Sequence, residues 1–581
     1  MTTARPAVPI DLDLRDVPFS RFGSYMALSW LEGERFENAG IAPGLWLRNL
    51  HGDGDYEVFH VEAVGPDGAA TVTSKPQASS DELRLAAEGG NSARVCFDAE
   101  EHLRIRLRGI GLRLTLTRGG FNSAVRLGEG RWRINAASAC RDYIAVALGG
   151  RLAVDAPWGV AGCRRVVVDL LPGDDGTGEF ALHQTRGVEP PPDAYPPYEQ
   201  VREEAVADLE AFARSYPAVD EELAAPAALA TYVNWASVVA PAGLSARPAM
   251  LMSKNWMAHV WSWDHCFNAL ALAAEAPEMA WDQFMLPFDR QTPLGQLPDL
   301  LNDVHSQYNF VKPPIHGWAY MAMLSANAFF ADPDRLAEVY RKLSAWQDWW
   351  LNCRNPSGDG LPLYHHGNDS GWDNGTAFDV GFPVKGPDLA TFLILQADAL
   401  AELAGRLGRP TDAQAHRDQA ERIFAALIDR LWSGERFLCP HAESGQVCDE
   451  SRSIIPAMPI LLGDRLAEDV RSALVARIRE NLTEWGPATE HPASSLYEAD
   501  GYWRGPIWAP STYLLIDGLR RCGQVDLAAD IAARFCRLCA TRGFAENYNA
   551  LTGAALRDRA YTWSASVFLI LAGQARSPEA D

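Results

Sequence analysis

The spacing of apolar residues changes once along the chain, near residue 200. Before that point short runs alternate apolar and polar residues, which is typical of antiparallel strands with one face toward solvent. Such runs occupy residues 56–61, 70–73, 103–107, 112–116 and 165–170, separated by Gly, Asp and Asn turns. This part is therefore predicted to form a β-sandwich of two antiparallel sheets.

From about residue 219 the apolar residues recur with the 3.6-residue period of helices. Asp332 followed by Pro333 predicts one helix start, because Asp caps free N–H groups and Pro suits the first helical position. No sequence repeat at a fixed period is visible, so a closed double ring of helices, an (α/α)6 barrel, is favoured over an open solenoid. Helices are expected near 220–240, 264–277, 279–289, 316–331, 333–352, 388–405, 411–432, 464–481, 508–522, 525–541 and 561–574.

The boundary between the two parts is expected at residues 172–200, where glycines and the prolines of Glu189–Pro192 and Pro196–Pro197 disfavour regular structure. A helix is expected at 199–215. The 581 residues also exceed the size of one ordinary core. The predicted division is a β-sandwich domain at 1–200, including a linker at 172–200, and a catalytic barrel domain at 201–581.

Charge and composition limit the partners. The net charge of -23 argues against nucleic acid and anionic membranes. Met1–Pro6 does not begin a basic segment followed by an apolar one, and no apolar run approaches ~18 residues, so neither a signal peptide nor a membrane span is predicted. The scattered cysteines favour reduced thiols in the cytoplasm, and Cys536 and Cys539 are expected to be buried in a helix rather than to bind zinc. His305 is expected to form hydrogen bonds rather than ligate a metal, because no partner stands at ligand spacing.

Aromatic residues point to carbohydrate. Many of the 19 tryptophans lie beside acids and glycines in loops between the expected helices. Sugar faces stack on aromatic rings while sugar hydroxyls bond to carboxylates. The richest loop is 365–375, where Asp373 is a candidate catalytic acid and Trp372 a candidate sugar platform, unless the loop is only a polar surface loop. Asp369 is the rival acid, and Asp264 and Asp388 are further candidates.

Other loops carry similar residues. Asp264 opens an expected helix and either contacts sugar or serves the helix dipole. Arg504 lies in the YWRGPIW motif at 502–508 and either clamps a carboxylate or pairs with Glu498 or Asp500. Glu546 lies among turn-forming residues in 544–553 and is either catalytic or a turn carboxylate. The long polar loop 291–314, which includes Gln307, is expected to be functional.

Six motifs occur in a fixed order: Trp263–Asp264, Pro313–Pro314, Ser370–Asn374, Pro387–Leu389, Tyr502–Trp508 and Glu546–Gly553. Together, over about residues 235–575, they resemble the glycoside hydrolase family 63 α-glucosidases and their mannosylglycerate and glucosylglycerate hydrolase relatives. The resemblance implies an (α/α)6 barrel, with an N-terminal β-sandwich in larger members. It implies Asp373 as general acid and Glu546 as general base, with Asp264 and Arg504 lining the glucose subsite. Ala550 departs from the family pattern, which has proline at this position.

The predicted function is that of an inverting, exo-acting hydrolase that cleaves α-linked glucose from the non-reducing end of a small carbohydrate. An inverting pair of carboxyls stands ~6.5–9.5 Å apart, and the acid has to stay protonated, which burial against Trp372 would favour. No metal or organic cofactor is expected, and the oligomeric state is left open. The alternatives are a sugar isomerase or epimerase with histidine bases and a non-catalytic carbohydrate-binding protein. The expected substrate contacts are Trp263, Asp264, Gln307, Trp318, His365, Trp372, Tyr502, Trp503, Arg504 and Tyr548.

Overall fold

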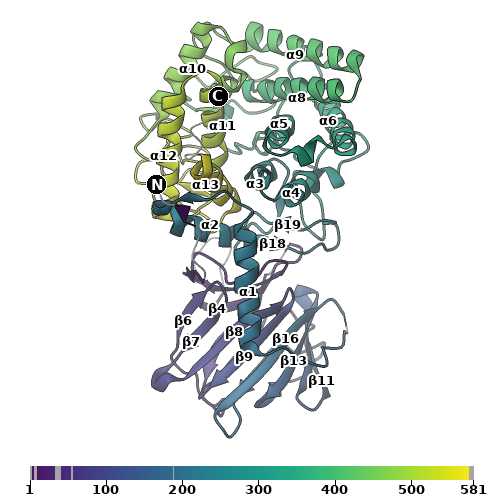
Figure 1. The fold of residues 1–581 in the computed structure, drawn as a ribbon, viewed down its shortest axis with the longest axis vertical. Helices are drawn as coiled ribbons and strands as arrows, with labels where there is room; N and C mark the ends of the chain where they lie inside the picture. The colour runs from purple at the N-terminus through teal and green to yellow at the C-terminus, as the bar shows by residue number, and fades with distance from the viewer. Residues whose placement is uncertain (1–2, 5–8, 33–40, 54–55, 188, 575–581) are drawn as a thin grey trace.

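A computed structural model of the chain describes residues 3–4, 9–32, 41–53, 56–187 and 189–574. Most of the N-terminal stretch Met1–Pro6 lies outside these residues. Figure 1 shows most strands at one end of the long axis, in purple and blue, and most helices at the other end, in teal to yellow. An N-terminal region of antiparallel sheets is thus followed by a helical region, as the change of period predicted.

Two antiparallel sheets make up most of the first region among the described residues. Apolar side chains from both sheets, such as Leu112 and Phe180, are buried in the same hydrophobic core. One sheet has the order β14 (Arg151–Asp155), β15 (Val166–Leu171), β10 (Gly111–Leu116), β5 (Glu57–Val64), β4 (Gly44–Asn49) and β3 (Met26–Leu31). The other has the order β11 (Ser123–Gly128), β12 (Arg131–Ala136), β13 (Arg141–Gly149), β16 (Thr177–Thr185), β9 (His102–Arg108), β8 (Ser92–Ala99), β7 (Leu83–Ala86), β6 (Lys75–Ser79) and β2 (Asp11–Leu12).

Two predictions for this region are wrong. Residues 70–73 form no strand; Thr71 makes one isolated bridge to Val64, and β6 begins only at Lys75. Residues 177–185 of the predicted linker form the interior strand β16, which pairs with β13 on one side and β9 on the other. Glycines nearby suggested a loop, but two neighbouring strands supply the backbone hydrogen bonds that local composition does not reveal.

Helix α1 (Tyr198–Ala213) joins the two regions, because it packs against β8 and against α2 (Ala224–Ser237). In Figure 1 it runs along the long axis beside the sheets. The remaining α-helices are α3 (Asp264–Leu272), α4 (Pro277–Asp289), α5 (His316–Ala326), α6 (Pro333–Cys353), α7 (Gly367–Ser370), α8 (Pro387–Arg406), α9 (Pro410–Leu431), α10 (Glu468–Asn481), α11 (Ala509–Arg521), α12 (Val525–Arg542) and α13 (Thr562–Gln574).

The helical region also contains the 3-10 segment η6 (Ile455–Arg465), which the helical pattern did not predict. Pro459 inside η6 removes a backbone donor, which disfavours an α-helix there. Short two-stranded ribbons connect helices: β18 (Val238–Val239) pairs with β19 (Ala249–Met250), β20 (Val260–Trp261) with β21 (Leu300–Leu301), and β22 (Asn547–Tyr548) with β23 (Ala555–Leu556). A further ribbon pairs β1 (Thr3–Ala4) with β17 (Val219–Asp220).

Contacts between helices return to their starting point. Helix α3 packs against α5, α5 against α8, α8 against η6, η6 against α11, α11 against α13, and α13 against α3. Each of these elements also contacts an element outside the cycle. Helix α4 packs on α3, α6 and α9 on α8, α10 on η6, α12 on α11, and α2 on α13, while α5 contacts the short 3-10 segment η4 (Ala328–Ala331). The helices of this cycle are therefore neighbours in space although they are spread over 300 residues of the helical region, from Asp264 to Gln574.

Smaller predictions are confirmed. The Asp332 side chain accepts hydrogen bonds from the N–H groups of Asp334 and Arg335 and caps α6. Cys536 and Cys539 are buried in α12, and each cysteine in the described part of the chain is free. Among the helices that the structure describes, none combines the length and apolar character needed to cross a membrane.

Candidate active site

The candidate loops share one structural position: each precedes an element of the helix cycle. Asp264 is the first residue of α3, and Lys312 lies shortly before α5. The 365–375 loop precedes α8, the 502–508 motif leads into α11, and the 544–553 loop precedes α13. Contacts between side chains from these loops bring several predicted residues together.

Tyr502 lies at the centre of these contacts. Its hydroxyl is hydrogen-bonded to the Glu546 carboxyl group. Burial, followed by the negative charges of Glu546, Asp373 and Asp264, raises the pKa of Tyr502 well above its ordinary value. A phenol in this environment stays protonated and can donate. The structure thus gathers Asp264, Asp373, Tyr502 and Glu546, which are four of the predicted site residues.

A lysine that the sequence interpretation overlooked lies among these acids. Lys312 is buried, and its Nζ lies 3.0 Å from Asp299 Oδ1 and 3.9 Å from Asp373 Oδ1. Burial alone would lower the pKa of Lys312, but Asp373, Asp299 and Asp264 raise it above its ordinary value. The side chain is therefore a cation that partly neutralises the acids. Its position directly before Pro313–Pro314, in a chain with few lysines, was the available signal.

Two of the acids are deeply buried. Burial, with a further contribution from Asp558, raises the pKa of Glu546 to about 8, against the hydrogen bond from Tyr502. Burial likewise raises the pKa of Asp264 to about 8 despite Lys312 nearby. Glu546 Oε1 and Asp264 Oδ2 are buried without a hydrogen-bond partner among the described residues. Buried acceptors of this kind fit a ligand that brings hydroxyl donors.

The environment of Asp373 differs from the prediction. Its side chain is 28% exposed rather than buried against Trp372. Trp372 itself is 0% exposed and meets the Trp503 ring edge-on, with 5.0 Å between ring centroids. The indole packs into the protein interior, so the neighbouring carboxyl group is left facing solvent. The expected burial of Asp373 is wrong in this structure, whereas a sugar contact from Trp372 remains a prediction.

The other tryptophans of these motifs pack against one another. Trp503 stacks on Trp508 with ring centroids 3.9 Å apart, and Trp263 lies 6.5 Å from Trp503. Trp263, Trp503 and Trp508 are buried and form an aromatic cluster. A Cβ on Gly371 would meet the Trp263 ring at 2.6 Å, which explains the glycine at this position. Direct sugar contacts from Trp263 and Trp503 remain predictions.

Two further predicted substrate contacts, Trp318 and Tyr548, form hydrogen bonds within the protein. The buried Trp318 donates its indole N–H to Asp517 on α11 at 2.8 Å. The buried Tyr548 donates its hydroxyl to the Gly543 carbonyl at 2.7 Å. Both side chains are thus hydrogen-bonded within the protein, and their role as substrate contacts remains a prediction. Both occur beside motif residues, and only packing reveals which way they point.

Both carboxylate oxygens of Asp369, the rival acid, accept hydrogen bonds within the protein. It is buried, and its Oδ2 accepts from Arg354 at 2.8 Å and from the His365 N–H at 2.9 Å. Its Oδ1 accepts from the Val311 N–H at 3.1 Å. Both oxygens are therefore occupied in holding the loop. His365 is exposed and contributes its backbone here, so a substrate contact from its side chain remains a prediction.

Asp388, the other candidate, is buried at the start of α8. It accepts a hydrogen bond from the Tyr364 hydroxyl at 2.9 Å, and burial raises its pKa to about 7. The shift in the pKa of Asp388 is caused by burial, which hydrogen bonds oppose, and not by the charges of Asp264, Asp373 or Glu546. We therefore regard Asp388 as a support for the loop next to Tyr364 and not as part of the central cluster.

Arg504 pairs with carboxylates of the protein. It forms a bidentate ion pair with Asp379, at 2.7 and 3.0 Å, and a second pair with Glu498 at 3.1 Å. Nearby, the Asn374 side chain accepts from the Trp503 N–H at 3.0 Å. These bonds join the loop that carries Asp373 to the 498–504 segment. The expected pairing with Glu498 is confirmed, whereas a substrate contact from Arg504 remains a prediction.

Gln307 lies beside the β20–β21 ribbon. Its backbone N–H donates to the Leu300 carbonyl, and its carbonyl accepts from the Asp299 N–H. Its side-chain Nε2 lies 3.3 Å from Nε2 of His305. His305 in turn belongs to a group with Asp53 and His259 that could hold a metal ion. Gln307 therefore sits next to this group, and its predicted sugar contact remains a prediction.

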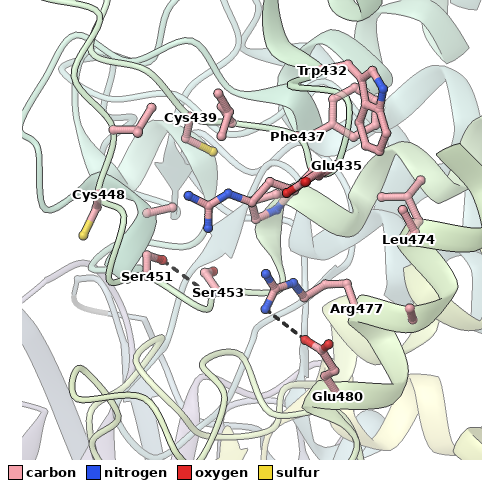
Figure 2. Close-up of a pocket in the computed structure, with 17 residues that line it drawn as sticks. Trp432, Glu435, Phe437, Cys439, Cys448, Ser451, Ser453, Leu474, Arg477 and Glu480 are labelled. Carbon is pink, nitrogen blue, oxygen red and sulfur yellow. Dashed lines mark hydrogen bonds and ion pairs between the residues drawn. The ribbon is translucent and has the colours of Figure 1, made fainter.

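A separate cavity of about 290 Å³ is lined in part by Ala377. Figure 2 shows Trp432, Phe437 and Leu474 on its walls, with Arg477 reaching toward Glu480 at 3.3 Å. Neither Asp373 nor Glu546 lines it. This cavity is distinct from the cluster around Tyr502.

A family model described as the mannosylglycerate hydrolase MGH1-like glycoside hydrolase domain matches residues 257–564, more than half of the chain. The chain belongs to this family. It is therefore a glycoside hydrolase, as the motifs predicted. The match includes all the residues gathered around Tyr502.

Known proteins show how far the similarity extends. The mannosylglycerate hydrolase of Rubrobacter radiotolerans is 25% identical over 428 residues, which cover 56% of this chain and 96% of that protein. A family 63 mannosylglycerate hydrolase from Thermus thermophilus, solved in complex with glucose, matches with a TM-score of 0.53 at 20% identity. The match covers 60% of this chain and 100% of the T. thermophilus chain. A bacterial glucoamylase solved with acarbose has a TM-score of 0.60 at 10% identity and covers 99% of this chain and 95% of its own. The two structures share the fold, and the glucoamylase shares it across both regions.

Proposed function

We propose that this glycoside hydrolase is exo-acting and inverting, and that it releases glucose from the non-reducing end of a small α-linked glycoside. Asp373 is the general acid and Glu546 the general base. The observation that carries the proposal is the gathering of both carboxyl groups around the Tyr502 hydroxyl, one partly open to solvent and the other buried. Acid–base hydrolysis of a glycoside uses two carboxyls in unlike environments. Because burial raises the pKa of Glu546 to about 8, the proposed base is ionised mainly at alkaline pH.

The architecture proposed for this chemistry is an (α/α)6 barrel at residues 201–581 behind a β-sandwich domain at 1–200. The closed cycle from α3 through α5, α8, η6, α11 and α13 would be its inner ring. The likeness of the fold to a glucoamylase over both regions supports this division. The connection between the domains is then the segment after β16, shorter than the sequence predicted.

In the proposed reaction Asp373 gives its proton to the glycosidic oxygen as the bond from that oxygen to the anomeric carbon breaks. Glu546 takes a proton from a water molecule, whose oxygen attacks the anomeric carbon from the opposite face. The sugar leaves as the β-anomer, the aglycone leaves with a hydroxyl group, and the two carboxyls have exchanged protonation states. Tyr502 donates to Glu546 and so favours the ionised base.

Asp264 and Lys312 have binding roles in this proposal. The unpartnered Asp264 Oδ2 accepts a hydrogen bond from a sugar hydroxyl. Lys312 holds the acids in place and reduces the repulsion between them, since it lies beside Asp299 and Asp373. The buried Trp503 and Trp508 pack against the Tyr502 ring and so support it.

Glucose and mannose are the two candidates for the sugar at the cleaved position. The R. radiotolerans relative is named a mannosylglycerate hydrolase, and the T. thermophilus structure contains glucose. We favour glucose at the cleaved position, with mannose as the competing sugar. Arg504 already binds Asp379 and Glu498, so recognition of a glycerate carboxylate would fall to other groups.

The test is proton NMR of purified protein with glucosylglycerate, mannosylglycerate and a series of α-glucosides, recorded at early times. β-Glucose as the first product is the expected result, and Asp373→Asn and Glu546→Gln should each abolish its release. α-Glucose as the first product would refute inversion. An isomerised sugar would indicate an isomerase, and no reaction with any of these compounds would refute the substrate class.

A further inference from the structure

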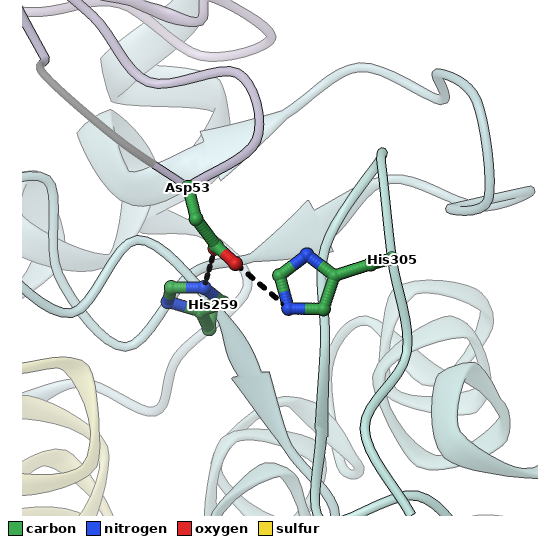
Figure 3. A group of neighbouring side chains, drawn as sticks. All are labelled: Asp53, His259 and His305. Atoms are coloured by element: carbon green, nitrogen blue, oxygen red, sulfur yellow. Dashed lines mark hydrogen bonds and ion pairs between the residues drawn. The ribbon is translucent and has the colours of Figure 1, made fainter.

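Asp53, His259 and His305 meet at the border between the sheet region and the helical region. Figure 3 shows the two imidazole rings facing the Asp53 carboxylate from different segments. His305 Nε2 lies 2.8 Å from Asp53 Oδ2, and His259 Nε2 contacts Asp53 Oδ1. One ligand atom of each side chain lies within 4.8 Å of those of the other two. Asp53 follows β4, His259 precedes β20, and His305 follows β21.

Neighbouring residues hold this group in place. Asn302 Nδ2 donates to Asp53 Oδ1 at 2.7 Å, and Asn302 Oδ1 accepts from the His305 N–H at 2.9 Å. The same amide therefore orients two members of the group. Asparagine and carboxylate side chains that fix the orientation of ligands in this way are the usual supports of a metal site.

A second set of bonds anchors the loop that carries Asp53. Asp303, which is buried, accepts from the Gly52 N–H at 2.8 Å and lies 2.8 Å from His51 Nδ1. The 302–305 segment thus holds residues 51–53 from two adjacent positions. Hydrogen bonds from the 302–305 segment therefore prearrange the group.

We propose that Asp53, His259 and His305 bind one divalent transition-metal ion of the zinc class. Two imidazole nitrogens and one carboxylate oxygen are donors that Zn²⁺ and Co²⁺ prefer, whereas Ca²⁺ and Mg²⁺ prefer oxygen donors throughout. The Asp53 side chain is 44% exposed, so an ion can enter from solvent and water can complete its coordination. In the metal-bound form each imidazole binds through Nε2 and carries its proton on Nδ1.

The distances allow this with small movements. Ligand atoms about 2.0–2.1 Å from a tetrahedral ion stand roughly 3.3 Å from one another. The His305–Asp53 contact, at 2.8 Å, has to widen by about half an ångström, and the shorter His259–Asp53 contact has to widen by more. Without the ion the carboxylate is hydrogen-bonded to His259 and pairs with His305, so the same residues have an arrangement in both states.

The ion would join the two regions next to the candidate active site. His259 and His305 flank the β20–β21 ribbon, in which Val260 pairs with Leu301. At the other end of this ribbon the Ser262 N–H donates to the Asp299 carbonyl at 3.1 Å, and Asp264 follows two residues later. A metal held through Asp53 would therefore tie this ribbon, and the acids beyond it, to the sheet region.

The test is a titration of chelator-treated full-length protein with Co²⁺, followed by visible absorption and by metal analysis of the dialysed protein. The expected result is one Co²⁺ per chain with the intense absorption of a tetrahedral site. Asn302→Ala should weaken binding by roughly 10–100-fold, as removal of an orienting partner does. His259→Gln and His305→Gln should each weaken it by more than Asn302→Ala. Since these measurements record metal and not turnover, they are independent of the proposed reaction.

The matched control is His102→Gln, which removes an imidazole of the sheet region that lies 4.2 Å from the His183 ring. This variant should keep the affinity and the spectrum of the wild type, and circular dichroism checks that every variant is folded. Absence of the tetrahedral band, retention of binding in folded His305→Gln, equal loss in His102→Gln, or equal affinity for Ca²⁺ would each overturn the proposal.

Discussion

Replacing Tyr502 by Phe removes one hydroxyl group from the centre of the site and leaves the ring. That hydroxyl is bonded to Glu546. The ring meets Trp508 edge-on with 4.8 Å between centroids, and the Tyr502 carbonyl accepts from the Trp508 indole at 2.9 Å. Phe keeps these contacts and the same left-handed backbone, with φ of 62°. The variant therefore isolates the hydrogen bond to Glu546.

The size of the effect follows from the charge that the bond stabilises. Burial raises the pKa of Glu546 to about 8, and the Tyr502 hydrogen bond opposes this rise. A hydrogen bond to a charged group contributes roughly 1.5–3 kcal/mol, and one pKa unit corresponds to about 1.36 kcal/mol. Loss of the bond should therefore raise the pKa of Glu546 by roughly 1–2 units. A general base acts only when ionised, so the acidic limb of the activity profile should move to higher pH by the same amount.

The assay is kcat/KM from about pH 5 to about pH 10 on the glycoside that the NMR series identifies. Tyr502→Phe should lose roughly 10–100-fold on the acidic limb and approach the wild type at high pH, as a shift of 1–2 units requires. Tyr497→Phe is the matched control, because its hydroxyl is buried without a hydrogen-bond partner in the described part of the chain. An unmoved acidic limb in Tyr502→Phe, or an equal movement in Tyr497→Phe, would refute the reasoning.

Four further substitutions test the roles of charge in the site. Asp373→Asn should abolish most turnover and keep the melting temperature. Asp369→Asn should lower the free energy of unfolding by about 3–5 kcal/mol, because Arg354 loses a buried partner. The opposite pattern would show that Asp369 is the catalytic acid and Asp373 the structural one. Lys312→Met should lower both stability and turnover, because buried carboxylates lose their cation, and thermal melting with product release measures both. Glu546→Gln should be inactive yet more stable than the wild type at neutral and higher pH. The pKa of Glu546, about 8 when folded, exceeds the unfolded value, so wild-type stability falls as the pH rises from about 4 to about 8. A gain in melting temperature that is the same at every pH would contradict this explanation.

The elements of the fold were predictable where the pattern of burial is local. Alternation predicted β5, β9, β10 and β15, because one face of each strand is buried. A 3.6-residue period predicted long helices such as α6, whose start is set by its own cap. The interior strand β16 was missed, because its stability comes from pairing with two strands that are distant in sequence.

The candidate chemistry was predictable only as a set of residue types. Loop composition and motif order selected Asp264, Asp373 and Glu546, and the structure brings these acids around Tyr502. Composition could not separate Asp373 from Asp369, since both lie in the same loop. The difference comes from Arg354, which binds Asp369 from a separate helix end.

The sequence by itself determined the two kinds of secondary structure, the family and the loops in which the acids lie, because periodicity and motifs are properties of neighbouring residues. Tertiary structure decided that Trp372 faces inward, that Lys312 lies among the acids, and that Asp53 meets His259 and His305. These contacts join segments far apart in the chain. Their geometry depends on how helices and sheets pack, and it cannot be predicted from the spacing of residues along the sequence.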